Sequence, residues 1–560
     1  MNSLIDTAII VIFSVFIMVV GLLFARTGRN LKSFFAGGEA VPWFIGGLSL
    51  FMSFFSAGTF VAWGSIAYKY GWVAITIQWT MCIGGLVTGL YLAPKWKATG
   101  NLTAAEFIKE RLGDKVQKSF IYIFMLVSLF IKGSVLYSVA KLVGSSLDFP
   151  LVPVTIILGL FMIAYTAVGG LWAVMVTDIL QFVVLTAAVL LIIPLAFTAA
   201  GGVPVFLSKV PDNFFHVVNG EYTWGFIFAF ALYHIFYIGG NWTFVQRYTS
   251  VDTPKSASKV AFLFAGLYVL SPVIWMLPPM IYKTINPGLS GLETENAYLM
   301  VCKQVLPAGL MGLMLTGMYF STSASANTAL NVVSAVFTND IYKGTINPGA
   351  SDKKLMKIAR ISSWAFGFGM IAIALIVPYI GGIVEFTLSV GAVTGGPLLA
   401  PPIWALFSKR ITGKATICIT LLSLGVNLVF KILLPLTANY KLNRAHEMIL
   451  GVGLPCILLL GYELFAAYKG NISREYLQLQ EHKAIRKAKI EQVDEDELLA
   501  IRRQNKFGLK VISFSLVFIA LLLYILCAFT NKGTTLVVVI ASIILLCSLI
   551  PFLGSRKISV

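Results

Sequence analysis

The membrane-spanning pattern of this chain is interrupted twice, at MSFFSAGTFVAWG (Met52–Gly64) and at HIFYIGGNWTF (His234–Phe244). Both stretches lie in long apolar runs, yet small and polar residues sit near their middles: Ser56, Gly58 and Thr59 in the first, and Gly239, Gly240 and Asn241 in the second. Glycine and serine also serve as packing residues in membrane helices. The matched pair favours two broken helices, which must face protein or a water-filled cavity because unpaired backbone groups are costly in hydrocarbon.

The composition places these stretches in a polytopic membrane protein. Of the 560 residues, 58% are hydrophobic and only 12% are charged. A soluble protein carries about 25% charged residues. This composition excludes a cytosolic enzyme, a secreted disulfide-rich domain and a DNA-binding domain. The six cysteines show no CxxC spacing and predict neither a disulfide framework nor a metal site.

About 15 apolar runs are long enough to cross a hydrocarbon core of ~30 Å as helices. They lie near residues 5–25, 43–68, 71–93, 119–147, 150–168, 171–198, 223–245, 260–283, 305–339, 358–380, 383–407, 414–435, 446–468, 507–529 and 534–553. The alternating pattern of a transmembrane β-barrel is absent. We therefore predict an all-α polytopic membrane protein.

The two interrupted spans occupy corresponding places in the chain. Each begins a block of five spans, residues 43–198 and residues 223–407. The first block starts on the inner side and the second on the outer side, so the blocks have opposite topology. Interrupted helices at matching positions of inverted repeats are typical of secondary transporters, which bind their substrate near the membrane midplane.

The remaining segments surround these two blocks. They are an N-terminal span with its loop (1–42), an extracytoplasmic loop (199–222), two further spans (408–468), a charged cytoplasmic segment (469–506) and two C-terminal spans with a short tail (507–560). The charged segment has mixed charges at helical spacing, which predicts an amphipathic helix. It is either a solvated tether or a site for a regulatory partner.

Basic residues predict the orientation. Most of the 42 Lys and Arg residues fall in the loops of one side when the N-terminus lies outside and the C-terminus is cytoplasmic, as the positive-inside rule requires. The net charge of +18 is therefore a sign of topology and does not support nucleic-acid binding. The predicted outer loops contain no N-x-[ST] acceptor, which favours a bacterial inner membrane.

Four ionisable residues in the predicted spans are candidates for function, because a charge in hydrocarbon is costly unless it faces protein or water. Lys132 lies near the middle of its span and must meet a carboxylate, an anionic substrate or water. Asp178 is nearer the cytoplasmic end and is either functional or a helix cap. Lys141 and Glu385 lie nearer the outer ends, where we expect Lys141 to snorkel and Glu385 to be interfacial.

The ninth span is rich in oxygen-bearing side chains. The stretch GMYFSTSASANTALNVVSAVFTNDIYK (Gly317–Lys343) contains Ser321, Thr322, Ser323, Ser325, Asn327, Thr328 and Asn331. Hydroxyl and carbonyl oxygens suit small hard cations, and Asp178 would supply the negative charge that this stretch lacks. The same groups could instead form hydrogen bonds between helices.

Three motifs together resemble the sodium:solute symporter family. YTAVGGLWAVMVTDILQ (Tyr165–Gln181) resembles the family's tyrosine–glycine–glycine–aspartate–glutamine signature, and the serine-rich stretch that runs into FTNDIYK (Phe337–Lys343) is similar to its sodium-site helix. WTFVQRYTS (Trp242–Ser250) is similar to the glutamine–arginine element after the sixth core helix. The resemblance covers roughly residues 30–470. It implies a LeuT-type five-plus-five inverted-repeat core that couples inward sodium flow to uptake of a small organic solute.

The resemblance implies a main sodium site and, as in some members of the family, a second one. The main site would be formed by the backbone carbonyls of Met52, Phe55 and Ser321 together with the hydroxyl of Ser325. Ala324 stands where the family usually has a second hydroxyl, which removes one ligand. The second site would be formed by Asp178, Asn327 and Thr328, with Asn327 in place of a serine.

The resemblance also implies a substrate site. Positions carried over from the sugar-transporting members are Thr59, Gln78, His234 and Tyr268, with Tyr237 resembling the aromatic gate beneath the substrate. Their side chains differ in type from the amide, carboxylate and lysine groups of the sugar pattern. Lys132 lies near the stretch where members that take acidic sugars carry a cation, so a sialic or uronic acid is a candidate solute. His234 either hydrogen-bonds the solute or packs between helices through a hydroxyl.

These observations predict a secondary transporter with sodium as the coupling ion and without an organic cofactor. Its expected partners are the solute, sodium and the lipid bilayer, without nucleic acid or an obligatory protein partner. A monosaccharide or a sugar acid is the favoured solute. Alternatives are an amino acid or a vitamin-like carboxylate such as proline or pantothenate, and a sodium-independent or proton-coupled carrier. The motifs HExxH, GxSxG and GxxxxGK[ST] are absent, which argues against a membrane enzyme and against ATP-driven pumping.

Overall fold

The computed structural model describes residues 3–24, 41–101, 103–147, 149–165, 171–307, 309–488, 495–529 and 533–558. These ranges are mostly helical, with one isolated β-bridge between Asn219 and Tyr222 and no strand. The all-α prediction is therefore confirmed. Residues 166–170, in the middle of the Tyr165–Gln181 motif, lie outside the described residues.

The helices follow the order of the predicted spans. The first block contains α3 (Trp43–Ser53), the π-helix η2 (Thr59–Trp63), α4 (Gly64–Tyr70), α5 (Val73–Val87), η3 (Thr88–Leu92), α6 (Ala93–Ala98), α7 (Ala104–Leu112), α8 (Asp114–Leu147), α9 (Leu151–Tyr165) and α10 (Leu171–Ala199). The second contains α12 (Trp224–Gly240), α13 (Trp242–Thr249), α14 (Pro254–Ile285), the 3-10 helix η5 (Gly291–Asn296), α15 (Ala297–Val305), α16 (Leu310–Val336), α17 (Asp352–Ile376) and α18 (Gly382–Phe407). Outside the blocks lie α1 (Ser3–Phe24), α19 (Gly413–Leu428), α20 (Leu434–Thr437), α21 (Arg444–Tyr468), α22 (Arg474–Ala488), α23 (Glu495–Cys527), α24 (Thr534–Cys547) and α25 (Leu549–Arg556).

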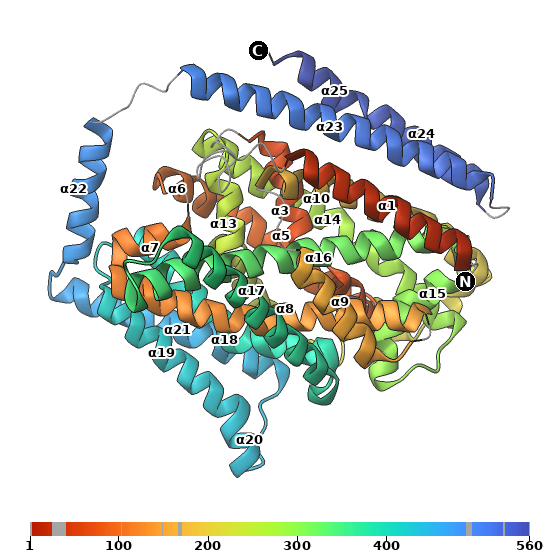
Figure 1. Cartoon of the computed structure of the whole chain (residues 1–560). Helices are drawn as coiled ribbons and strands as arrows, with labels where there is room; N and C mark the ends of the chain where they lie inside the picture. The colour runs from red at the N-terminus through yellow and green to blue at the C-terminus, as the bar shows by residue number, and fades with distance from the viewer. Residues whose placement is uncertain are drawn as a thin grey trace.

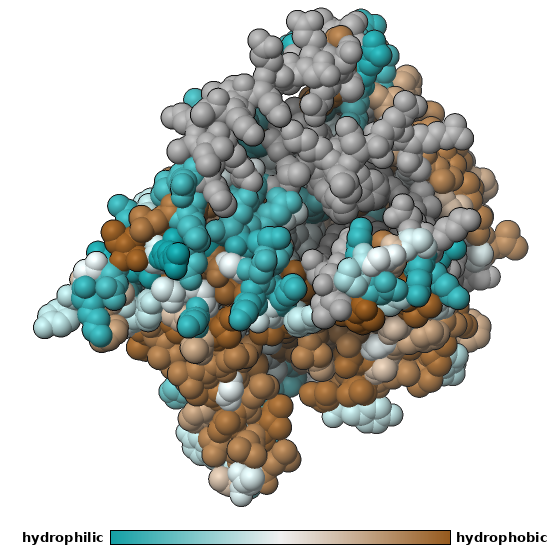
Figure 2. All heavy atoms as spheres, turned by 60° about the vertical axis from the view of Figure 1, so that its left-hand side comes forward, coloured by the Kyte–Doolittle hydropathy of each residue, from teal (hydrophilic) through white to brown (hydrophobic). Residues whose placement is uncertain are grey.

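Eleven helices in the described ranges are long and apolar enough to cross a membrane. The other predicted spans coincide with the shorter apolar helices α3, α9 and α12 and with α16. Large apolar side chains are exposed on the outside, for example Leu421, Leu428 and Leu436 in the α19–α20 region that projects at the bottom of Figure 1. Figure 2 shows hydrophilic side chains gathered in a band above such hydrophobic surface, as expected where a protein passes from lipid to water.

Both predicted breaks are present. α3 ends at Ser53, and η2 begins at Thr59 after an irregular stretch. α12 ends at Gly240, and Asn241 takes an extended conformation (φ −65°, ψ 127°) before α13 begins. Asn241 caps α13, because its Oδ1 accepts a hydrogen bond from the Thr243 N–H at 3.0 Å. The backbone opened by the second break is thus satisfied within the protein.

In the part of the chain that the structure describes, two hydrophobic clusters hold the helices together. The larger one fills the space between the two blocks. The smaller one joins α1, α10, α23 and α24, where Phe16 stacks on Phe518 with ring centroids 4.2 Å apart and Phe24 stacks on Trp172 at 6.4 Å. Figure 1 shows α1 running beside α23 and α24. The helices of both termini therefore pack on the core through α10.

A buried carboxylate also ties α1 to α16. Asp6 is 2% exposed and accepts hydrogen bonds from the backbone N–H groups of Gly309 (2.8 Å) and Gly312 (3.0 Å) at the start of α16. The N–H groups at the start of a helix have no intrahelical acceptor. Here the acceptor is the Asp6 carboxylate, which belongs to a different helix. A Cβ at Gly312 would lie 2.4 Å from the Asp6 backbone oxygen, which explains the glycine.

The charged segment 469–506 is divided between α22 and the beginning of α23, with residues 489–494 outside the described ranges. α22 packs on α7 and buries Leu479 to 3% exposure. Arg111 of α7 is fully buried and donates hydrogen bonds to the Ser473 hydroxyl (3.4 Å) and the Ser408 carbonyl (2.8 Å). The first half of the segment is therefore docked on the protein, which corrects the expectation of a solvated tether there.

Candidate functional site

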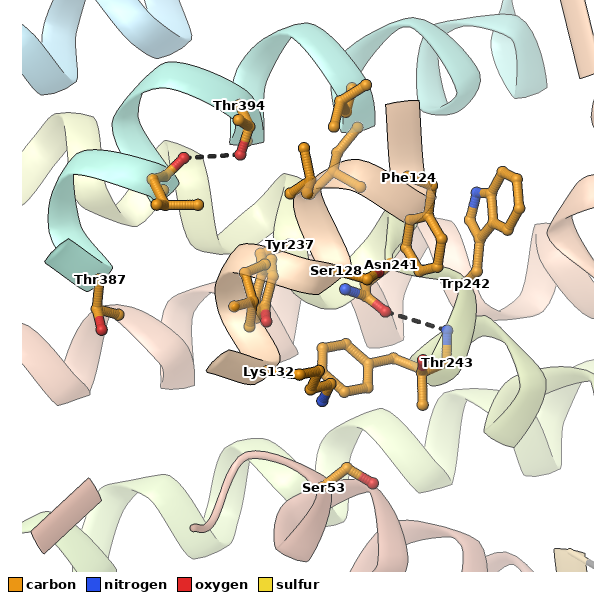
Figure 3. A pocket seen from close by; sticks show the side chains of 18 of the residues that line it. Ser53, Phe124, Ser128, Lys132, Tyr237, Asn241, Trp242, Thr243, Thr387 and Thr394 are labelled. Atoms are coloured by element: carbon orange, nitrogen blue, oxygen red, sulfur yellow. Dashed lines mark hydrogen bonds between the residues drawn. The ribbon is translucent and has the colours of Figure 1, made fainter. Parts of the chain in front are cut away.

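The two broken helices border a cavity of about 160 Å³. Residues of α3, α8, α10, α12, α13, α16 and α18 line it, so both blocks contribute. Figure 3 shows Asn241 at the second break near Tyr237 and Trp242, with Lys132 and Ser53 among the other lining residues. This is the place where inverted repeats with interrupted helices bind their ligands.

Among the described residues, three charged side chains line the cavity: Lys132, Asp178 and Arg247. The carboxylate of Asp178, 5% exposed, accepts a hydrogen bond from the Ser49 hydroxyl at 2.7 Å. Arg247 is 2% exposed, and its Nη1 donates to the Thr243 carbonyl of its own helix at 2.9 Å. Within the described ranges, no carboxylate forms an ion pair with Arg247. Arg247 and Asp178 thus border the same cavity and interact electrostatically, but the guanidinium has no directly bound carboxylate among the described residues.

Arg247 was absent from the residues predicted for the site. It belongs to the WTFVQRYTS motif, and it lies on α13 within two helical turns of the break at Asn241. A basic residue so close to an interrupted helix is the feature of the sequence that could have identified Arg247 as a site residue. Its exposure to the cavity depends on how α13 packs, which the local sequence does not show.

The main predicted sodium site lies at the first break. Ser321 donates its hydroxyl to the Phe55 carbonyl at 2.9 Å, and the Met52 carbonyl accepts from the Phe55 N–H, also at 2.9 Å. The Thr322 hydroxyl accepts a hydrogen bond from the Ala57 N–H at 2.9 Å. Two consecutive hydroxyls of α16 therefore hold the open backbone of the first broken helix.

The cavity brings together residues predicted for both sodium sites. Met52, Ser321 and Asp178 all line it. The neighbouring Ser323 hydroxyl is buried without a hydrogen-bond partner among the described residues. α16 also carries Ala324, Ser325, Asn327 and Thr328, whose side chains lie outside the described ones. The two ligand sets stay predictions.

Of the predicted substrate residues, Lys132 and Tyr237 line the cavity, whereas Thr59 and His234 are not among its lining residues. The Thr59 hydroxyl donates to the Phe54 carbonyl at 3.2 Å, inside the first break. Nδ1 of His234 lies 2.6 Å from the Thr80 hydroxyl, which links α12 to α5. This contact matches the packing alternative for His234.

Gln78 and Tyr268 are also buried away from the cavity lining. The Gln78 amide donates to the Ala74 carbonyl of its own helix at 3.4 Å. The Tyr268 ring packs on Phe51 and Phe264, with centroids 5.0 and 4.7 Å apart. In this conformation both residues make contacts within the protein, and their role in solute binding stays a prediction.

Aromatic rings form part of the cavity wall. Phe124 stacks on Trp242 (4.8 Å between centroids, 12° between planes), and Tyr233 stacks on Tyr237 (5.3 Å, 18°). The hydroxyl-bearing lining residues are Ser53, Ser128, Ser134, Tyr233, Tyr237, Thr243, Ser321, Thr387 and Thr394. Flat apolar surfaces together with hydroxyls and charges suit a ring-shaped polar molecule.

Comparisons with known proteins agree with these features. The model of the sodium:solute symporter family matches residues 34–421. The sodium/glucose cotransporter of Vibrio parahaemolyticus is 26% identical over 487 residues, covering 80% of this chain and 88% of that protein. The sodium/sialic acid symporter SiaT of Proteus mirabilis is 24% identical over 444 residues, covering 76% and 87%.

The fold has a close counterpart among solved structures. The substrate-bound outward-open state of a Na+-coupled sialic acid symporter superimposes with a TM-score of 0.68 at 20% sequence identity. The match covers 83% of this chain and 98% of that one. The predicted LeuT-type fold is therefore confirmed.

Proposed function

This chain belongs to the sodium:solute symporter family, and we propose that it takes up a carboxylate-bearing sugar together with sodium. Membership of the family makes it a sodium-coupled transporter and not an enzyme. The solute class is the proposed part: a sugar acid of the sialic or uronic acid kind.

The observation that carries the proposal is Arg247. Its guanidinium is buried, lines the cavity and has no ion-pair partner in the described part of the chain. A buried charge is costly without a counter-charge. A solute carboxylate would provide one, with charge-assisted hydrogen bonds to the paired donors of the guanidinium. Lys132 lines the same cavity and would strengthen the attraction.

A neutral monosaccharide is the second candidate. The stacked pairs Phe124–Trp242 and Tyr233–Tyr237 offer apolar surfaces on which a sugar ring can lie. The similar protein of Vibrio parahaemolyticus is a sodium/glucose cotransporter. A neutral sugar would use these surfaces but would leave the guanidinium of Arg247 without a directly bound carboxylate.

We place the coupling sodium at the first break. The main ligands would be the carbonyls of Met52, Phe55 and Ser321 and the hydroxyl of Ser325, with Asp178, Asn327 and Thr328 around a second ion. Sodium there would favour the conformation in which the solute site is complete, and closure followed by rocking of the bundle would carry both ligands across. One charge moving through 100 mV supplies ~2.3 kcal/mol, enough for roughly 40-fold accumulation per sodium.

The proposal includes an orientation and a division of the chain. The N-terminus would lie outside and the C-terminus in the cytoplasm of a bacterial inner membrane, with the repeats at residues 43–198 and 223–407. Attaching a reporter that is active only in the cytoplasm to each terminus tests the orientation. We expect the reporter to be active only at the C-terminus. A reporter active only at the N-terminus would reverse the proposed orientation.

Uptake into proteoliposomes tests the solute. A panel of labelled sialic acid, glucuronate, glucose, myo-inositol, proline and pantothenate is presented with an inward sodium gradient, and again with choline in place of sodium. We expect sodium-dependent uptake of an acidic sugar. Sodium-dependent uptake of glucose or myo-inositol alone would replace the acid by a neutral solute, and uptake indifferent to sodium would contradict the coupling.

Charge-neutralising variants test the two cations. Arg247→Gln and Lys132→Gln should each raise the KM for the acidic sugar about tenfold or more, because each would remove a charge-assisted contact with the solute carboxylate. The matched control is Lys115→Gln, which removes an exposed charge from the same helix as Lys132. An unchanged KM in both test variants would contradict the anion site.

A further inference from the structure

A buried carboxylate lies in the connection between α14 and α15. This connection contains η5, whose residue Glu295 is 2% exposed. Glu295 is not among the residues predicted from the sequence, and the proposed transport site makes no use of it. A carboxylate that is so deeply buried requires partners that compensate for the loss of water.

Glu295 joins three separate segments. Its Oε1 accepts a hydrogen bond from the backbone N–H of Ile383, in the first turn of α18, at 2.9 Å. Its Oε2 accepts one from the Tyr137 hydroxyl of α8 at 3.0 Å and forms an ion pair with Lys141, one turn further along α8. The Lys141 side chain is only 12% exposed, so this pairing replaces the expected snorkelling.

The start of α18 is shaped around this carboxylate. Gly381 and Gly382 both have positive φ angles (93° and 84°), and a Cβ at Gly382 would lie 2.3 Å from Glu295 Oε1. The carboxylate also lies at the N-terminal end of α18, where the helix dipole favours a negative charge. Any other residue at position 382 would displace Glu295.

The same connection is fastened to the second half of the first broken helix. The hydroxyls of Ser65 on α4 and Thr294 on η5, both buried, lie 2.7 Å apart. Tyr68 of α4 donates its hydroxyl to the Asn286 carbonyl at 2.5 Å and accepts from the Leu289 N–H at 3.1 Å. The connection therefore links α4 to α8 and α18. Glu295 provides contacts to both α8 and α18.

This junction lies directly beyond one end of the cavity. On α8 the lining residues run from Phe120 to Ser134, and Tyr137 follows within the next turn. On α18 they start at Phe386, and Ile383 lies in the turn before. The contacts to Glu295 follow the lining residues in sequence on α8 and precede them on α18. Both helices therefore place Glu295 at the same end of the cavity, about one helical turn beyond the last lining residue. At that end the joined segments follow directly after the lining residues of both helices.

We propose that Glu295 is a positioning residue of the transport cycle that keeps this end of the cavity closed. Its carboxylate holds α8 and α18 against the α14–α15 connection, and these contacts must separate before the cavity can open there. The role concerns the movement of the protein and does not depend on which solute is carried. Without the carboxylate, Lys141 and the first turn of α18 lose their common partner, and the closed arrangement becomes less stable.

Labelling of a cysteine in the cavity tests this proposal. The six native cysteines are replaced, and Thr387→Cys, a lining position on α18, becomes the only thiol. A membrane-impermeant maleimide is added to either side of oriented vesicles in turn. With Glu295 intact we expect slow labelling from the side of the junction. Glu295→Gln should raise that rate about tenfold or more by removing the ion pair.

The matched control is Glu293→Gln, which removes an exposed carboxylate two residues away in η5. It should label like the parent. Equal rates for Glu295→Gln and the parent, in protein that elutes as a single species, would overturn the proposal. If Glu295→Gln does not fold, Tyr137→Phe decides the question, because it keeps the ion pair and removes only the hydroxyl that donates to Glu295 and accepts from Lys141. No increase in its labelling rate would also overturn the proposal.

The labelling needs neither solute nor sodium, so its failure is distinct from a failure of the proposed function. Uptake kinetics give a second readout. A change in the conformational equilibrium should alter the KM and the maximal rate together for every transported solute, whereas a purely structural defect lowers only the amount of active protein and leaves the KM unchanged. An unchanged KM in Glu295→Gln would overturn the proposal.

Discussion

Ser321 shows how one side chain connects the predicted sodium site to the fold. Its hydroxyl bonds the Phe55 carbonyl within the first break, and the side chain also lines the cavity. The carbonyl is one that the break has freed from helical pairing. A hydroxyl beside such a carbonyl is a suitable environment for a small hard cation. The same residue thus holds the open backbone and borders the cavity.

Ser321→Ala should therefore raise the sodium concentration required for half-maximal uptake. We expect an increase of about 5- to 10-fold, from a lost contact worth about 1 kcal/mol. Sodium titration of solute uptake in proteoliposomes measures it. The control is Thr316→Ala on the same helix, whose buried hydroxyl donates only to the Gly312 carbonyl of its own helix. Equal shifts in both variants would show that Ser321 acts only through helix stability.

At the scale of elements, helices that lie outside the two blocks hold parts of the core. Asp6 of α1 caps the start of α16, the helix that carries Ser321. The start of α22 is held at the α7 surface by Arg111 and at the start of α19 by Glu475, which accepts from the Gly413 N–H at 3.3 Å. These appended helices are therefore built into the structure by specific polar contacts.

Asp6→Ala should destabilise the protein by about 1–2 kcal/mol, because two backbone N–H groups at the start of α16 lose their acceptor. Thermal unfolding in detergent, followed by tryptophan fluorescence, measures the loss. Asp6→Asn keeps an acceptor oxygen of similar reach and should recover most of the stability. If Asp6→Asn is as unstable as Asp6→Ala, the negative charge and not the cap is the important feature.

Docking of α22 should weaken in acid. Burial by itself would raise the pKa of the Glu475 carboxyl, but hydrogen bonds from Ser473 and Gly413 and the charge of Arg111 hold this pKa below its ordinary value. A pKa that is lower in the docked state stabilises docking above the ordinary value of 4.5, and this contribution is lost as the pH falls through the docked-state pKa.

Hydrogen exchange of the first two turns of α22 between pH 6 and pH 3.5, corrected for intrinsic rates, measures this effect. Protection should decrease towards the acid end. In Glu475→Gln it should be low at both pH values, whereas Glu481→Gln, an exposed position on the same helix, should behave like the parent. A pH-independent difference between parent and Glu475→Gln would contradict the titration of Glu475.

In the molecule as a whole, helices from the two terminal regions of the chain lie together on one side of the core. Helices α1, α23 and α24 share a hydrophobic cluster with α10, and the contact at Gly508 is especially close. A Cβ at Gly508 would lie 2.4 Å from the indole ring of Trp172. The C-terminal helix pair is thus fitted closely against the first block.

Gly508→Ala should destabilise the protein by about 1–3 kcal/mol through overpacking against Trp172. The sign is informative, because alanine in place of a helical glycine is otherwise neutral or stabilising by up to ~1 kcal/mol. Gly461→Ala on α21 is the control, since its Cβ would meet nothing within 4 Å. Thermal unfolding of the three proteins decides, and equal midpoints for parent and Gly508→Ala would show that the C-terminal helices pack loosely.

The class of protein, the spans, the two breaks and the family can be inferred from the order of the amino acids alone. These features depend on hydropathy, helix-breaking residues and short motifs, which act within one or two helical turns and are therefore legible along the chain. The sequence also indicated Lys132, Asp178 and Tyr237, which line the cavity.

Which polar groups meet depends on how the helices pack, and the structure was needed to show it. The structure paired His234 with Thr80, placed Arg247 at the cavity, and joined Glu295 to Lys141 and Ile383. Glu295 lies 154 residues from Lys141 and 88 from Ile383. A buried charge must find its partner in three dimensions, and that partner is set by how helices pack, which no local pattern of residues contains.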